Sequence, residues 1–269
     1  MRKKYTFTNE EICRVREFAQ KIISSDSQAR RSFGSNVRTE NESVSDTFQG
    51  KLAEVAFVKF AQQFGAVVSV DYDIYPDHYQ IDFGQDIDQI YESGKPARLI
   101  PRIDIKASRN YSKWLLIEHY KFWADAYVFI KVKIPQELRS DINKIKPESG
   151  IEAEVAGFAY HFDIIDPKTK SPWFQFNQNA RLFDPDPLLF YVPKHHLESP
   201  QTLSQWIDEK NKNKELTWKN VYLKCSLNFG LPEIWLRSSD EDWSFFINWI
   251  KSSTINNDDI LPNDFDIPF

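Results

Sequence analysis

Residues 48–64 constrain the fold most, because FQGKLAEVAFVKFAQQF places small and apolar side chains at helical spacing. The spacing predicts a helix with a broad apolar face, and Gly65 is a typical residue to end it. From residue 67 to 133 the chain changes to short runs that are typical of strands. These runs are VVSVDY, DIDQIY, RLIPRIDIKAS, KWLLIEHY and DAYVFIKVKI. A helix with such a face needs a sheet to cover, so we expect an α/β fold with a central mixed β-sheet flanked by helices.

The segments on either side of this region predict further elements. Thr8 and Glu11 form a capping-box pattern that starts a helix running to about Ser24, and the polar residues 25–46 read as a loop or mobile arm. EDWSFFINWI predicts a closing helix, and before it the apparent strands EVAGFAYHFDII, PLLFYV and VYLKCSL alternate with proline-rich turns. We expect one packed domain in four parts. These are an N-terminal helix and basic arm (1–47), a core (48–134), a β-rich C-terminal elaboration (135–250) and an acidic tail (251–269).

Composition bounds the class of protein. The chain has 269 residues, and 41% hydrophobic residues are enough to build a sizeable core. It has no run of about 18 apolar residues and no apolar signal-peptide segment, so we expect a cytoplasmic protein without a membrane partner. The net charge of −5 argues against a general nucleic-acid coating protein, because binding many phosphates needs a clustered positive field.

The stretch IDIKAS, residues 103–108, predicts a strand that shows two opposite charges on one face. Side chains alternate along a strand, so the isoleucines and the alanine pack inward while Asp104 and Lys106 share the other face, about 6.6 Å apart. The Asp-x-Lys pattern recurs at 166–168 and 208–210, but there it falls in a turn and in a polar helix end or loop. Only in IDIKAS do apolar neighbours fix the spacing within a strand.

A second carboxylate lies upstream of this strand. If residues 92–96, ESGKP, form the turn of a hairpin, Asp86 lies opposite Asp104 with the two Cβ atoms about 5 Å apart. Two like charges in that position repel unless a cation or a shared proton lies between them, and Mg²⁺ prefers oxygen ligands. The pair is therefore a candidate metal site. A shift of register would put Asp88 or Asp82 in place of Asp86.

A third carboxylate, Glu54, lies on the predicted helix at the border of its apolar arc. At about 100° per residue, its neighbours on the helix surface include Gly50, Phe57 and Ala61. A carboxylate among such neighbours loses hydration and needs a partner. Glu54 either faces the sheet as a third acidic group or is an ordinary boundary glutamate.

In chain order, a helix glutamate, a hairpin aspartate and a strand Asp-x-Lys resemble the PD-(D/E)xK nuclease superfamily, most of all a type II restriction endonuclease. The matching stretches are FQGKLAEVAF, FGQDIDQIY, RIDIKASRNYSKWLL and DAYVFIKVKI, which span about a third of the chain. The resemblance implies a restriction-endonuclease-like core and a metal-dependent hydrolysis of DNA phosphodiester bonds. Pro76-Asp77 spells the Pro-Asp of the motif name, but it stands in a DHYQ turn 27 residues before Asp104, so we rank Asp86 above Asp77.

The resemblance also implies a role for each site residue. Asp86, Asp104 and the backbone carbonyl of Ile105 would hold Mg²⁺, with Mn²⁺ as a substitute. Lys106 would orient or help deprotonate the attacking water, and Glu54 would bind a second metal ion or hold its water. The competing interpretation is a buried Asp–Lys–Glu ion network without catalysis.

Two stretches are candidates for contact with double-stranded DNA. The polar residues after the Asp-x-Lys strand are placed to contact phosphates. In SPWFQFNQNARL, residues 171–182, the amides and the guanidinium suit base edges and the aromatics suit an extruded base, or the aromatics belong to the core and the amides face water. The polar candidates are Ser108, Arg109, Asn110 and Lys113 in the first stretch, and Gln175, Asn177, Asn179 and Arg181 in the second.

The function that we expect from these features is a sequence-specific restriction endonuclease that acts as a homodimer, since cutting both strands of a palindrome needs two related sites. A repair, recombination or anti-phage defence nuclease of the same fold is an alternative. A non-catalytic nucleic-acid or protein-binding module is another. The sequence has no GxxxxGK[ST] or GxGxxG motif, so we expect no nucleotide cofactor.

Overall fold

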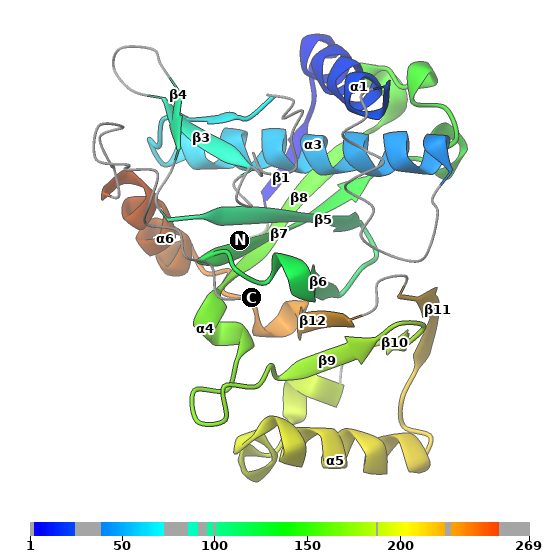
Figure 1. The fold of residues 1–269 in the computed structure, drawn as a ribbon, viewed down its shortest axis with the longest axis vertical. Helices are drawn as coiled ribbons and strands as arrows, with labels where there is room; N and C mark the ends of the chain where they lie inside the picture. The colour runs from blue at the N-terminus through cyan, green and yellow to red at the C-terminus, as the bar shows by residue number, and fades with distance from the viewer. Residues whose placement is uncertain are drawn as a thin grey trace.

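The computed structural model describes residues 3–24, 39–72, 86–90, 96–98, 101–186, 188–223 and 227–252 (Figure 1). The protein is α/β, with a mixed central sheet and helices, as the sequence predicts. Within these ranges, no helix is both long enough and apolar enough to cross a lipid bilayer.

The central sheet has the strand order β1-β8-β7-β5. β1 and β8 pair antiparallel, as do β8 and β7, whereas β7 and β5 are parallel. The strands are β1 (Lys3–Thr6), β5 (Ile103–Arg109), β7 (Ala126–Lys133) and β8 (Glu152–Tyr160). β5 is thus an edge strand of this sheet. β1 and β8 come from segments that the sequence analysis placed outside residues 48–134, so the sheet draws on more of the chain than the predicted core.

Three helices cover one face of the central sheet (Figure 1). They are α1 (Asn9–Ser24), α3 (Glu40–Gln63) and α6 (Asp240–Ser252). Buried residues of these helices pack with Ile103 and Ile105 of β5 in a first hydrophobic core. α3 is buried over most of its second half because it lies between the sheet and the other helices. The predicted helices at 8–24 and 241–250 and the predicted end at Gly65, where φ is +77°, are confirmed.

α3 starts earlier than its apolar pattern suggested, so the prediction of a loop over residues 25–46 is wrong for residues 40–46. Thr39 is the N-cap: its hydroxyl accepts the Glu42 N–H at 3.3 Å, and the Glu42 carboxylate accepts the Thr39 N–H at 3.0 Å. The first turns are polar because they extend beyond the core, and a capping box stabilises them without apolar packing. Residues 25–38 lie outside the described residues.

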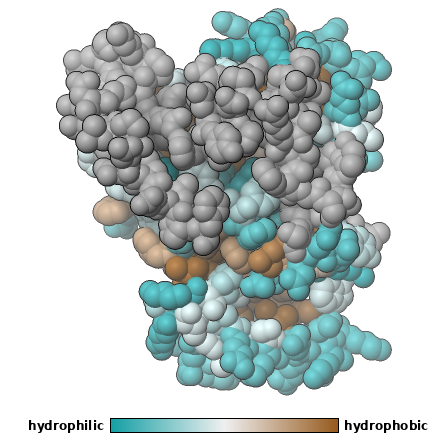
Figure 2. Space-filling model, viewed as in Figure 1, coloured by the Kyte–Doolittle hydropathy of each residue, from teal (hydrophilic) through white to brown (hydrophobic). Residues whose placement is uncertain are grey.

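A second antiparallel sheet, with the order β6-β12-β9, covers the opposite face of the central sheet. Tyr127 and Phe129 of β7 point to this side and pack with Trp114 and Leu231 in a second core, which α5 closes with Leu203. On the face seen in Figure 2, apolar side chains gather in a band above the hydrophilic surface of α5. The elements are β6 (Trp114–Glu118), β9 (Phe174–Asn177), α5 (Pro200–Lys212) and β12 (Leu227–Pro232).

The remaining elements are small. β10 (Arg181–Phe183) pairs with β11 (Trp218–Tyr222), and α4 (His161–Ile164) follows β8. The predicted strand PLLFYV is wrong, because Leu188–Tyr191 forms a 3₁₀ helix. Prolines on both sides of these residues lack the N–H groups that a strand ladder needs.

A small antiparallel sheet joins β2 (Val68–Val70), β3 (Ile87–Ile90) and β4 (Pro96–Arg98). The predicted hairpin therefore exists, but its register is different. Asp88 pairs with Arg98 and Ile90 with Pro96, so the hairpin folds around residue 93 and its second strand ends before β5 begins. The predicted pairing of β3 directly with β5 is wrong.

Candidate active site

Asp104 and Lys106 lie on the face of β5 that is turned away from α3. Ile103 and Ile105 belong to the first core, so alternation sends the two charged side chains towards the second core. In the parallel register they lie beside Tyr127 and Phe129 of that core. Asp104 is 6% exposed, and Lys106 Nζ is 2.7 Å from Asp104 Oδ2. The strand brings the pair together as the sequence predicts.

Asp86 reaches β5 although its hairpin does not pair with that strand. Its N–H donates to the Ile103 carbonyl at 3.3 Å, and its Oδ2 accepts the Ile105 N–H at 2.6 Å. The carboxylate is thus fixed at the outer edge of β5, next to Asp104. The structure therefore brings Asp86, Asp104 and Lys106 together. The side chain of Asp88, and Asp82 and Asp77 entirely, lie outside the described residues.

Glu118 is a fourth charged group at this site, which the sequence analysis missed. It is the last residue of β6, and its Oε2 lies 3.6 Å from Lys106 Nζ. Burial acts to lower the pKa of Lys106, but the charges of Asp104, Glu118 and Asp86 outweigh it and raise this pKa above its ordinary value. Lys106 is therefore a charged ammonium group among three carboxylates. In KWLLIE the only signal was a glutamate that ends an otherwise apolar strand.

The outer edge of β5 offers oxygen atoms of the kind that Mg²⁺ binds. A residue in a strand points its N–H and C=O to the same edge, so Ile105, whose N–H faces Asp86, also turns its carbonyl there. Among the described residues, no three His, Cys, Asp or Glu side chains are close enough to hold a metal ion by themselves. A metal ion here would use two carboxylates, one carbonyl and water or phosphate oxygens, which is the usual ligand set of Mg²⁺. The donor chemistry fits.

Glu54 is buried, but it lies on α3, which packs against the other face of β5. Its Oε2 is 2.6 Å from Nζ of Lys51, which also donates to the Asp71 carbonyl at 2.7 Å. The Asp71 N–H in turn donates to the Asp86 carbonyl at 3.5 Å. Glu54 is thus linked to the site through Lys51 and Asp71, and its role towards a second metal ion stays a prediction.

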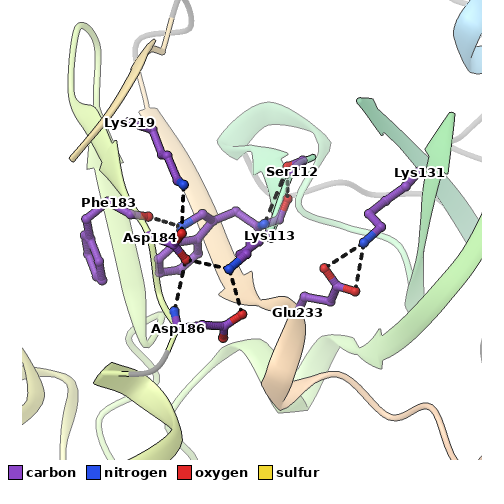
Figure 3. A network of polar contacts seen from close by, with 9 residues as sticks. Ser112, Lys113, Lys131, Phe183, Asp184, Asp186, Lys219 and Glu233 are labelled. Carbon is purple, nitrogen blue, oxygen red and sulfur yellow. Dashed lines mark hydrogen bonds and ion pairs between the residues drawn. The ribbon is translucent and has the colours of Figure 1, made fainter. Parts of the chain in front are cut away.

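A second buried lysine lies on the same face of the central sheet. Lys131 of β7 is paired in register with Ser108 of β5 and is 7% exposed. Its Nζ contacts both carboxylate oxygens of Glu233, at 3.0 and 3.1 Å (Figure 3). It also lies 3.6 Å from Glu154 Oε1. The chain therefore builds two lysine–carboxylate clusters on one face.

Lys113, a candidate for contact with a DNA phosphate, is engaged by two aspartates of the protein in this structure, and its contact with DNA stays a prediction. Its Nζ lies 2.9 Å from Asp184 and 3.0 Å from Asp186, and Lys219 contacts Asp184 at 2.7 Å (Figure 3). We call these four residues the β6–β10 brace, because they join the start of β6 to the segment after β10 and to β11. The lysine charge is already balanced within the brace, so it has little attraction left for a phosphate.

The other candidates for DNA contact lie in two parts of the structure, at the end of β5 and along residues 175–181. Arg109 and Asn110 are exposed where β5 ends, Ser108 is half-buried beside them, and Arg109 donates to the Tyr111 hydroxyl at 2.7 Å. In the second stretch the aromatic side chains belong to or pack against the second core, which is the second of the two alternatives that the sequence left open. The polar side chains there are exposed, and their contact with DNA stays a prediction; they are Gln175, Asn177, Asn179 and Arg181.

Comparison with known proteins adds no relative: no family model, no curated protein and no solved structure matches this chain.

Proposed function

We propose that this protein is a metal-dependent endonuclease that hydrolyses phosphodiester bonds in double-stranded DNA. One observation carries the proposal: Asp86 Oδ2 accepts the Ile105 N–H at the edge of β5, and on the same strand Lys106 Nζ lies 2.7 Å from Asp104 Oδ2. The order of helix, hairpin and Asp-x-Lys strand also supports a restriction-endonuclease-like core. Mg²⁺ bound there would polarise the phosphate and lower the pKa of a coordinated water.

The side chains of the protein would hold the ion and stabilise the charge that develops during hydrolysis. Asp86 and Asp104 would hold their oxygens at the edge of β5, since the Ile105 N–H fixes one carboxylate and the strand fixes the other. Lys106 would donate a hydrogen bond to the attacking water or to the phosphate oxygens as negative charge develops on them. The burial of Asp104 and Lys106 strengthens these interactions, because fewer water molecules screen them.

Within this proposal, sequence-specific cleavage by a homodimer is the form that the resemblance favours. Arg109 is exposed about 10 Å along β5 from Lys106, and exposed Asn110 follows the strand, so both are placed to contact phosphates next to the one that is cut. Protein–DNA contacts of this kind fix the register of the backbone and leave base recognition to other residues.

A non-catalytic module is the second candidate, and the Lys131 cluster is the observation that favours it. This chain buries a lysine against Glu233 on the same face without any metal-ligand arrangement around it in the described residues. The Lys106 cluster could be a second ion network of that kind. A cleavage assay separates the two candidates.

The test uses the purified full chain with supercoiled plasmid and linear phage DNA, in Mg²⁺ or in EDTA. We expect cleavage in Mg²⁺ alone, and a decrease of at least about 100-fold in Asp104→Asn and Lys106→Met. The matched control is Lys168→Met, because Lys168 belongs to the Asp-x-Lys turn, where Asp166 caps the turn and the lysine is exposed. Discrete fragments would support sequence-specific cutting. Equal cleavage by all variants, or none that needs a divalent ion, would overturn the proposal.

A further inference from the structure

The ammonium group of Lys106 lies between two carboxylates at unequal distances. It is 2.7 Å from Asp104 Oδ2 and 3.6 Å from Glu118 Oε2. The two partners also differ in burial, since the Asp104 side chain is 8% exposed and that of Glu118 is 24% exposed. In this structure Asp104 is the main partner of Lys106, and Glu118 lies just beyond hydrogen-bond distance.

Asp104 cannot serve Lys106 and a divalent cation equally well. Both are positive and both need the oxygens of the same buried carboxylate, and two positive charges a few ångströms apart repel strongly where water is scarce. A metal ion held by Asp86 and Asp104 would therefore displace the ammonium group. Lys106 then needs a second acceptor, because an unpaired buried charge is costly.

Glu118 is placed to be that acceptor. Moving Nζ by about 1 Å would shorten the contact with Glu118 to the length of a charge-assisted hydrogen bond. The four-carbon stem of lysine permits such a movement without moving the backbone. Glu118 itself is held in place, because β6 pairs with β12 and Glu118 lies opposite Asn228 in that ladder. The backbone of Glu118 is thus fixed by the ladder, and the Lys106 side chain can move towards its carboxylate.

We propose that Glu118 is a positioning residue: when a divalent cation binds at the edge of β5, the Lys106 ammonium group leaves Asp104 and binds Glu118 instead. We call this change of partner the hand-over. Until then, the Lys106 ammonium fills the place of that cation at Asp104. This inference rests on the proposed metal-dependent function. It adds a competition for Asp104 between the Lys106 ammonium group and the divalent cation. In this role Glu118 also keeps Lys106 charged and directed towards the site after the cation has bound Asp104.

The test measures the affinity of the full-length protein for Mg²⁺ alone, by titration calorimetry without DNA. Lys106→Met removes the competing ammonium and should tighten binding about 10-fold. Glu118→Gln removes the second acceptor and should weaken binding about 10-fold. In the double variant, Glu118→Gln should have no further effect, because there is no ammonium left to hand over. This dependence on Lys106 separates the hand-over from a general effect of charge.

Glu154→Gln is the matched control, since Glu154 lies 3.6 Å from the other buried lysine, Lys131, and should leave Mg²⁺ affinity unchanged. Glu118→Asp, which keeps the charge, should recover part of the affinity and serves if Glu118→Gln does not fold. Thermal melting in EDTA verifies that each variant is folded.

Three results would overturn the inference. Unchanged affinity in Glu118→Gln, while the wild type binds Mg²⁺, would refute the hand-over alone. An equal loss with and without Lys106 would make Glu118 a ligand of the ion instead. No saturable Mg²⁺ binding by the wild type would remove the proposed metal site, and the inference with it.

Discussion

Lys106 and Lys131 are both buried on one face of the central sheet, yet their surroundings differ. Lys131 contacts both oxygens of Glu233, at 3.0 and 3.1 Å, and the two side chains are 8% and 7% exposed (Figure 3). Both lysines also have a second carboxylate at 3.6 Å, Glu154 for Lys131 and Glu118 for Lys106, but the short contact of Lys106 is to a single oxygen of Asp104. Lys106 also lies near Asp86, which hydrogen-bonds the outer edge of β5.

The difference between the two lysine clusters indicates which kind of ion cluster only stabilises the fold and which kind can also bind a cation. Lys131 is bound by both oxygens of Glu233 and lies 3.6 Å from Glu154, so that cluster has two carboxylates for one ammonium group. Around Lys106 there are three carboxylates and one ammonium group, so the cluster carries excess negative charge that an added cation would reduce. Buried ion pairs by themselves are weak evidence for function, whereas an unbalanced cluster at a strand edge is stronger.

The largest effect on stability is expected for Lys131→Met. Glu233 would be left buried without its counter-charge, which costs about 3–5 kcal/mol of unfolding free energy. Urea denaturation should give this loss in EDTA and in Mg²⁺ alike. Recovery by Mg²⁺ would mean that Glu233 and Glu154 also bind a cation, and the distinction between the two clusters would fail.

Lys106→Met should cost somewhat less, about 3 kcal/mol in EDTA: Asp104 is left buried without its main counter-charge, but the other two carboxylates, Glu118 and Asp86, are partly exposed. In contrast to Lys131→Met, Mg²⁺ should restore stability, by about 2.7 kcal/mol at 100 times its dissociation constant. The same denaturation experiment with and without Mg²⁺ measures this. A loss that Mg²⁺ leaves unchanged would place Lys106 in the same structural class as Lys131.

The β6–β10 brace should contribute least, because its lysines are partly exposed. Burial acts to raise the pKa of Asp184, but hydrogen bonds from Lys219 and Lys113 lower it below the ordinary value. A lowered folded-state pKa gives stability that is present above the unfolded-state pKa of about 3.9 and is lost as the pH falls through the folded-state value. Asp184→Asn should remove about 1 kcal/mol or less at pH 7 and nothing at pH 2.

Urea midpoints at the two pH values measure this prediction. Asp208→Asn is the control, since Asp208 is exposed on α5 and should show no such dependence on pH. A larger loss at pH 2 than at pH 7 would contradict the assignment.

Local patterns predicted the elements that local interactions determine. The helices at 9–24 and 48–63 and the strand IDIKAS follow from the spacing of their apolar residues and from Gly65. The start of α3 at Glu40 was missed because its polar first turns depend on the Thr39 cap instead of on apolar packing.

Of the candidate site, only the residues that lie on one strand were predictable from the local sequence pattern. Asp104 and Lys106 are two residues apart, so alternation alone brings them together. Asp86 was named from a hairpin register that is wrong, and it reaches β5 through its own side chain and N–H. Glu118 and Lys51 come from other elements, so only the tertiary arrangement shows where they lie. For the same reason, no local pattern predicts that Asp184 and Asp186 bind Lys113.

The position of β1 has a consequence for how the chain is made. Lys3 pairs with Val155 and Thr6 with Glu152, so the fourth strand of the central sheet is added by the first residues of the chain to a strand synthesised about 150 residues later. During translation residues 3–6 therefore cannot pair until β8 has left the ribosome. Contacts of such long sequence separation make folding slow.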